Sequence, residues 1–161
     1  MDILDKAIEF ELEGNKFYLE NAAMAKTKAV KSILQNLAQD ELEHAEFLKF
    51  LKNNQVDDFK PSKTLGKVKD ILKESSLNDP DFLKKDADVI EVLHKALAIE
   101  EKARQHYTDE AISTLDEKSQ KLLKLLALEE EKHYKLIDNL IKFLDNPGNL
   151  LESQEFSFYD E

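Results

Sequence analysis

Two pairs of glutamate and histidine share one spacing within helix-favouring stretches of the sequence. Glu41 is followed three residues later by His44, and Glu130 is followed three residues later by His133. On a helix, residues three apart lie on the same face, about one turn from each other. The carboxylate of such a pair can bridge two metal ions while the imidazole binds one of them. The spacing therefore favours a metal site built on two helices.

Two further glutamates, Glu11 and Glu100, lie among apolar residues that recur with the helix period, so we expect them on buried faces. Burying an unpaired carboxylate is costly, and four carboxylates in one layer require compensating charge. Two divalent cations would supply that charge. We therefore predict that two metal ions are bound by six residues, whose four glutamates would act in catalysis through the metals: Glu11, Glu41, His44, Glu100, Glu130 and His133.

A metal-free layer of buried ion pairs is the structural alternative for these six residues. It would leave an excess of buried negative charge, and it gives no reason for the doubling of the set. A third pair, Glu91 and His94, has the same spacing, but at about 100° per residue both lie away from the helix face that carries Glu100. We therefore expect His94, like His106, to lie at the surface or on the flank of its helix.

Two tyrosines follow the glutamates of the first and third helical segments. Tyr18 comes two turns after Glu11, and Tyr107 comes two turns after Glu100. A buried tyrosine needs a partner for its hydroxyl group, and a ligating carboxylate would provide one. Contact with these carboxylates and plain core packing explain the two tyrosines equally well.

Four other residues adjoin the predicted ligands. Asp40 and Glu129 directly precede the second and fourth ligating glutamates, where each could accept a hydrogen bond from the far nitrogen of a histidine or be a solvated charge. Gly14 and Ala103 come three residues after the first and third glutamates. Because glycine within a helix is unfavourable, we interpret these small residues as open space beside the metals for a small oxidant.

Four long segments that carry the helix period must position these residues. Capping residues predict helix starts at Thr27, Asp88 and Asp116, with Asp2 before the first helix. The first two and last two helices are joined by short loops, so each pair should form an antiparallel hairpin. The predicted helices span about 3–25, 28–53, 88–112 and 117–144.

A long crossover, about residues 54–87, joins the two hairpins, with a short helix near Leu65 to Glu74. With only 3 Gly and 3 Pro in 161 residues, we predict an all-α fold with one four-helix bundle domain at 1–145. The acidic tail at 146–161 contains three aromatic residues, and we expect it to dock on the bundle or on a neighbouring subunit.

The two hairpins are copies of each other. Adding 89 to a position in the first hairpin gives an equivalent residue in the second, which predicts a pseudo-twofold axis that brings matched residues face to face. The matched pairs include Leu4 and Leu93, Glu11 and Glu100, Tyr18 and Tyr107, Leu37 and Leu126, Glu41 and Glu130, and His44 and His133.

The segments around the six predicted ligands resemble those of rubrerythrin-type ferritin-like proteins, over roughly residues 1–145. They are ELEGNKFY from Glu11, DELEH from Asp40, EEKARQHY from Glu100 and EEEKH from Glu129. The resemblance implies a ferritin-like bundle with a di-iron carboxylate site that reduces hydrogen peroxide or oxygen. Rubrerythrins proper also have a rubredoxin domain with Cys-ligated iron, whereas this chain has no cysteine. They also have an extra site glutamate one turn after the ligand of the third helix, and this chain has Ala103 at that position. A separate electron-donor protein is therefore expected.

Composition excludes several other classes of function. The 34 acidic residues exceed the 23 basic ones and give a net charge of -11, which repels nucleic acid and anionic membranes. The absence of cysteine excludes disulfides, iron–sulfur clusters and thiol catalysis. No segment shows an export signal or a membrane span. We expect a cytoplasmic protein with neither nucleic acid nor membrane as a partner.

Two alternatives to peroxide or oxygen reduction keep the same ligands. An iron-binding protein that oxidises and stores ferrous iron would form a hollow multimer, whereas a peroxide reductase needs only a homodimer. A di-manganese site would give a catalase-like enzyme. Because oxygen and nitrogen ligands also accept manganese or zinc, the ligand set alone leaves the metal open.

Overall fold

The computed structural model describes residues 3–53, 59–78 and 87–145. Within these ranges every element is an α-helix and no strand occurs, which confirms the predicted all-α fold. The predicted tail at 146–161, the predicted cap Asp2 and the ends of the crossover lie outside the described residues. The helices are α1 (Ile3–Met24), α2 (Lys28–Lys52), α3 (Thr64–Asn78), α4 (Ala87–Ser113) and α5 (Glu117–Asp145).

Side-chain caps explain where two of the long helices begin. The Thr27 hydroxyl accepts a hydrogen bond from the Val30 amide at 3.2 Å and starts α2. Asp116 does the same for α5 by accepting from the Ser119 amide at 3.2 Å. The prediction for Asp88 was wrong, because α4 already begins at Ala87 and Asp88 lies inside its first turn, where a negative charge favours the helix dipole.

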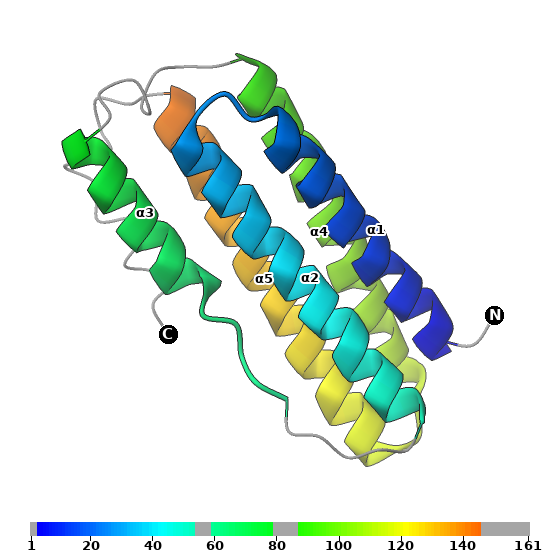
Figure 1. Ribbon diagram of the computed structural model, residues 1–161. Coiled ribbons are helices and arrows are strands. Elements are labelled where there is room, and N and C mark those ends of the chain that lie inside the picture. Colours follow the sequence, from blue (N-terminus) through cyan, green and yellow to red (C-terminus); the bar gives the residue numbers. More distant parts are fainter. Residues whose placement is uncertain (1–2, 54–58, 79–86, 146–161) are drawn as a thin grey trace.

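Two antiparallel hairpins, α1 with α2 and α4 with α5, form the bundle, and α1 also contacts α4 (Figure 1). The helix α3 lies outside the bundle against α2, with Val68 fully buried. It extends further than the short helix predicted at 65–74. Residues 59–63, which precede α3, run along the outside of the bundle (Figure 1), where Ser62 contacts Asp40 on α2 and Glu129 on α5.

Apolar residues fill the bundle in two clusters along its length. The larger one occupies the end near the loop between α1 and α2, and the smaller one occupies the opposite half. The glutamates and histidines lie between them, which removes the site from water on both sides. Representative members are Leu34, Leu37, Leu93, Leu136 and Ile137 in the first cluster, and Ala7, Leu48, Ala111, Leu123 and Leu126 in the second.

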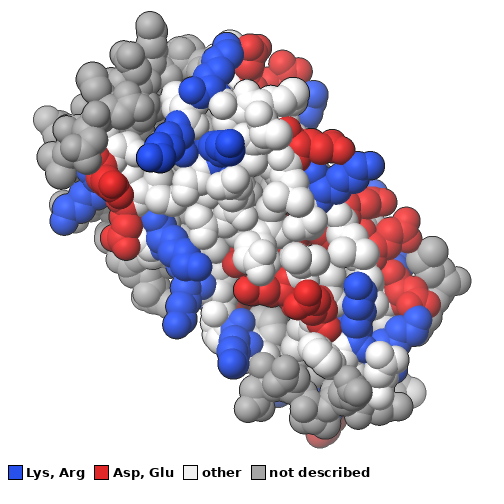
Figure 2. Space-filling view, viewed as in Figure 1, with Lys and Arg blue, Asp and Glu red and all other residues white. Residues whose placement is uncertain are grey.

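None of the helices in the described ranges is long and apolar enough to cross a membrane. In Figure 2, charged side chains of both signs lie around a broad area of other residues.

Candidate metal centre

The bundle brings all six sequence-predicted ligands into one buried cluster. Glu11 comes from α1, Glu100 from α4, and one Glu-x-x-His pair comes from each of α2 and α5. Each side chain replaces an apolar residue on the inward face of its helix, because its position follows the same period as the surrounding leucines. None of the six is more than 4% exposed: Glu11, Glu41, His44, Glu100, Glu130 and His133.

The six residues form two overlapping groups of four, each with one histidine. In one group, ligand atoms of Glu11, Glu41, His44 and Glu130 all lie within 4.8 Å of one another. In the other, Glu41 and Glu130 are joined by Glu100 and His133 within the same limit. Two carboxylates therefore belong to both groups, which is the arrangement that a pair of bridged metal ions requires.

Six buried atoms of this cluster make no hydrogen bond within the described part of the chain: Glu11 Oε2, Glu41 Oε1, His44 Nδ1, Glu100 Oε2 and both carboxylate oxygens of Glu130. His44 Nδ1 lies 3.2 Å from Glu130 Oε1 and 3.4 Å from Glu11 Oε2, without hydrogen-bond geometry. Buried polar atoms are normally paired, so these atoms need another partner. Oxygen and nitrogen donors converging in this number fit divalent metal ions.

The pKa values of the four glutamates divide into two pairs. Burial and repulsion from neighbouring carboxylates raise the pKa of Glu41 and Glu130 well above its usual value. Burial also acts to raise the pKa of Glu11, but attraction to His44 outweighs it and lowers that pKa to about 2. The pKa of Glu100 is lowered as well, because attraction to His133 outweighs the effect of burial. Without metal, the cluster must therefore retain protons.

The two histidines are held differently. His133 Nδ1 faces the cluster at 3.0 Å from Glu41 Oε1, while its Nε2 lies 2.8 Å from Asp40 Oδ2. A proton on Nε2 leaves the Nδ1 lone pair for a metal. Burial lowers the pKa of His133, but Glu100 and Asp40 outweigh burial and raise it well above its usual value. The pKa of His44 is raised as well, since attraction to Glu11 exceeds the effect of burial.

Both tyrosines contact carboxylates of the opposite hairpin. The Tyr18 hydroxyl donates to Glu100 Oε1 at 2.5 Å, and the Tyr107 hydroxyl donates to Glu11 Oε1 at 2.5 Å. Burial and the adjacent carboxylates raise the pKa of both phenols well above 10, so each remains a donor. Of the two interpretations drawn from the sequence, contact with a carboxylate describes them, and the pairing crosses the pseudo-twofold axis.

The crossover contributes contacts that the helix period did not predict. The Ser62 hydroxyl donates to Asp40 Oδ2 at 2.5 Å, and its amide lies 3.4 Å from both carboxylate oxygens of Glu129. Asp40 therefore supports His133 as the sequence suggested, whereas Glu129 bonds the crossover and not the other histidine. Phe59, also in the crossover, stacks on His44 with ring centroids 6.2 Å apart. No spacing in the sequence relates these crossover residues to the ligands.

Gly14 has a different role from the one predicted. A Cβ atom at this position would lie only 2.8 Å from Glu41 Oε2 and 3.3 Å from Glu41 Cδ. The space beside Gly14 is therefore filled by the Glu41 carboxylate and is not open room for an oxidant. The glycine lets this carboxylate approach α1 closely.

The other two histidines lie away from the cluster, as expected. His94 is exposed on α4. His106 lies on the flank of the same helix, half-buried, with its ring edge-on to Phe10 at 5.0 Å. The Glu-x-x-His spacing alone therefore does not identify a ligand, and the helix face is the deciding signal.

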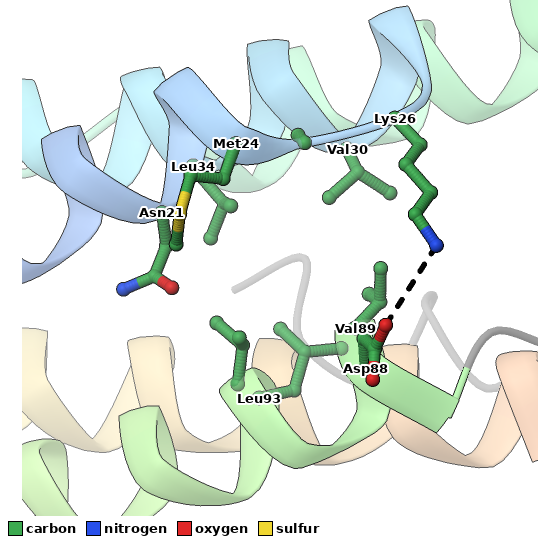
Figure 3. Close-up of a pocket in the computed structure, with 10 residues that line it drawn as sticks. Asn21, Met24, Lys26, Val30, Leu34, Asp88, Val89 and Leu93 are labelled. Atoms are coloured by element: carbon green, nitrogen blue, oxygen red, sulfur yellow. Dashed lines mark ion pairs between the residues drawn. The ribbon is translucent and has the colours of Figure 1, made fainter.

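A separate pocket of about 270 Å³ lies at the end of the bundle where α1 joins α2 (Figure 3). Side chains such as Val30, Leu34 and Leu93 point into it, and the Lys26 Nζ lies 3.7 Å from the Asp88 Oδ2 at one side. Its lining is apolar apart from this ion pair and an asparagine. Among the described residues, the groups of converging side chains that could hold a metal ion lie in the buried cluster and not in this pocket.

Comparison with known proteins agrees with this geometry. No curated protein and no solved structure matches the chain significantly. The sequence matches the rubrerythrin family over residues 2–141, which is most of its length. That family consists of ferritin-like helical bundles that bind di-iron, in agreement with the fold and with a buried Glu and His cluster that could hold metal. The chain therefore belongs to the rubrerythrin family.

Proposed function

We propose that the buried cluster holds two iron ions and that the protein reduces hydrogen peroxide, or oxygen, at this site. Glu41 and Glu130 would bridge the two ions, because they alone belong to both groups of four ligands. Glu11 and His44 would be the other ligands of the first ion. Glu100 and His133 would be the other ligands of the second. Four carboxylates would then balance the charge of two ferrous ions.

The observation that carries this proposal is the doubled set of buried donors without hydrogen-bond partners. Five carboxylate oxygens and one imidazole nitrogen converge without such partners in the described part of the chain. A metal-free layer would have to keep Glu41 and Glu130 protonated against their usual chemistry. Two cations remove both difficulties at once.

Two bound ferrous ions would supply the two electrons that convert one hydrogen peroxide and two protons into two water molecules. The chain's own residues would fix the geometry of this reaction. The hydroxyl protons of Tyr18 and Tyr107 point at Glu100 Oε1 and Glu11 Oε1, which orients both carboxylates. Asp40 holds the His133 ring, and the two apolar clusters exclude bulk water. The electrons that restore the ferrous pair would come from a donor outside these 161 residues, which contain no cysteine.

Oxidation of ferrous iron followed by storage is the second candidate. Ala103 favours it, because resemblance to rubrerythrins places an extra site glutamate at this position. Ala103 is buried and offers no ligand atom. A site with fewer carboxylates would be less complete as a peroxidase while still able to bind and oxidise iron.

Anaerobic loading with ferrous iron, followed by stopped-flow mixing with peroxide and with oxygen, tests the proposal. Two irons per chain and much faster oxidation by peroxide would support a peroxide reductase. Preference for oxygen with continued uptake of excess iron would instead support iron oxidation and storage. Failure to bind two metal ions would overturn both.

A further inference from the structure

A second pocket, of about 230 Å³, opens beside the buried cluster on the side of α2. The pocket lies between α2 and the crossover segment before α3. Figure 2 shows acidic side chains in the lower half of this face, over α2 and α5. Its lining combines acidic, aromatic and hydroxyl groups with one lysine: Asp40, Glu43, His44, Glu46, Phe47, Phe50, Phe59, Lys60 and Ser62.

The rim of this pocket carries negative charge that its counterpart in the second hairpin lacks. Glu43 and Glu46 are both exposed and line the pocket. Adding 89 to their positions gives Lys132 and Lys135 on α5. The repeat therefore preserves the predicted ligands but reverses the sign of the charge at these two positions, which favours the α2 side for a cation.

The inner end of the pocket reaches a ligand of the predicted metal site. His44 lines the pocket although it is only 4% exposed, and its Nδ1 points into the cluster without a hydrogen-bond partner among the described residues. Its Nε2 also makes no hydrogen bond within the described residues, whereas the equivalent atom of His133 is held by Asp40. Asp40 therefore holds the His133 ring through its Nε2, whereas His44 lies between the pocket and the other predicted ligands.

An aromatic ring packs against this histidine. Phe59 stacks on the His44 ring with an interplanar angle of 29°, and Phe47 meets Phe59 edge-on at 5.1 Å. The His44 ring also stacks on the His133 ring, with centroids 6.0 Å apart. An ion that passes from the pocket to the cluster must therefore move past Phe59 and the edge of His44.

From the acidic rim and the buried His44 imidazole, whose Nδ1 lacks a hydrogen-bond partner among the described residues, we infer that this pocket is the path by which divalent cations enter the metal site. Glu43 and Glu46 would attract the ion, and His44 would be the first ligand it meets. This inference rests on the proposed function, since it requires that the six buried residues bind metal. The cation would enter from the α2 side, and Glu43, Glu46 and Phe59 would control the rate of its uptake.

Rate and affinity separate the two roles. Exposed carboxylates at the mouth should raise the rate of association through long-range attraction, which weakens as salt is added. A ring that only narrows the passage raises the barrier for entry and exit equally, so it changes both rates by the same factor and leaves the dissociation constant unchanged. A ligand, by contrast, would change the dissociation constant.

The first test measures uptake of Co²⁺ by the metal-free protein in stopped flow, followed by visible absorbance. The double variant Glu43→Gln with Glu46→Gln should take up Co²⁺ about three- to tenfold more slowly at low salt and lose most of the salt dependence. The matched control, Glu9→Gln with Glu13→Gln, removes the same charge from exposed positions on α1 that do not line this pocket. It should retain nearly the full rate.

The second test replaces Phe59 by Ala and, to preserve more of the packing, by Leu. Uptake of Co²⁺, and its release to an excess of chelator, should accelerate by the same factor in each variant, more for Ala than for Leu. The dissociation constant and the stoichiometry of two ions should not change.

Unchanged uptake in both the glutamate double variant and the Phe59 variants, with normal Co²⁺ affinity, would overturn the entry path and leave the metal site intact. Equal slowing in the α1 control would likewise overturn it, because the effect would then be one of net charge. Absence of Co²⁺ binding in the unmodified protein would overturn the proposed function as well.

Discussion

Glu41 and Glu130 occupy positions where the helix period predicts an apolar residue, and each belongs to both groups of side chains that could hold a metal ion. The sequence predicted them because a carboxylate on a buried stripe conflicts with its surroundings, and because the conflict occurs twice at the same spacing. His94 shows why the buried face of the helix matters. It follows Glu91 at the same spacing, but it is exposed to solvent and is therefore not a candidate ligand of the buried site.

Replacing either shared carboxylate tests the metal site directly. We expect Glu41→Ala and Glu130→Ala each to reduce bound iron and to lower the thermal midpoint of the iron-loaded protein, because bound metal stabilises the folded state by mass action. In the metal-free protein the loss should be smaller, since the substitution also removes repulsion between carboxylates. Metal analysis and calorimetry measure both, and His94→Ala is the control that should change neither. An unchanged amount of bound iron in both glutamate variants would show that these residues do not bind the metal.

Gly14 shows where residue-level prediction failed. Spacing placed it beside the site, but spacing does not reveal which neighbour fills the room that a missing side chain leaves. Only the packed bundle shows that the Glu41 carboxylate occupies it.

Gly14→Ala should therefore displace the Glu41 carboxylate and weaken metal binding, despite the higher helix propensity of alanine. Gly66→Ala in α3 is the matched control, because a Cβ there meets no atom within 4 Å. That control should stabilise the protein by roughly 0.5–1 kcal/mol through the lower backbone entropy of its unfolded chain. Metal titration and urea unfolding of both variants distinguish the cases, and equal metal affinity in the two would show that Glu41 moves aside freely.

At the level of elements, the four bundle helices lie within one or two residues of their predicted ends, since apolar periodicity and caps determine them. The crossover was predicted only as a connection, because an irregular segment has no period that relates it to the helices. Its Ser62 nevertheless joins Asp40 on α2 to Glu129 on α5. A loop thereby completes the support of a buried histidine that the helices alone would leave less constrained.

Ser62→Ala should loosen this support. Asp40 would lose its hydroxyl donor, which we expect to cost about 1 kcal/mol of stability and to weaken metal binding roughly tenfold, as for other partners of metal ligands. Ser113, exposed near the end of α4, provides a control in which alanine should change stability by less than about 0.5 kcal/mol. Competition with a chelator measures affinity, and equal affinity in both variants would assign Ser62 a purely connecting role.

Across the whole molecule, the repeat correctly predicted that matched residues meet near the pseudo-twofold axis, where the rings of His44 and His133 stack with centroids 6.0 Å apart. Away from the axis this prediction was wrong, because Leu37 and Leu126 belong to different apolar clusters. The crossed tyrosine contacts follow from the same symmetry. Differences in side-chain support between the halves were not predictable, because they arise from the described crossover residues 59–63, where Ser62 contacts Asp40 on α2 and Glu129 on α5. Asp40 bonds a histidine while its counterpart Glu129 bonds the crossover.

The charge of the buried cluster should make the stability of the metal-free protein depend on pH. The pKa values of Glu41, Glu130, His44 and His133 are all raised in the folded chain. Between the ordinary carboxyl value of 4.5 and the raised values, the folded state binds more protons than the unfolded state. The free energy of unfolding then decreases as pH rises, because its slope follows the protons bound in the unfolded state minus those bound in the folded state.

The groups with lowered pKa values oppose this trend. The lowered carboxyls act at acid pH, and His106, whose pKa burial lowers, acts near its ordinary value of 6.5. Glu11, with a pKa of about 2, contributes stability above 4.5 that is lost as pH falls towards 2, so it adds nothing to the change above neutrality. The metal-free protein should therefore be less stable at about pH 9 than at about pH 6, with the loss continuing as the histidines pass through their raised pKa values. Bound Zn²⁺ should reverse the trend, because metal replaces protons on the same ligands and binds better as they are released. Urea unfolding with and without Zn²⁺ across this range measures the difference, and a parallel pH dependence in the two forms would mean that the cluster holds no excess protons without metal.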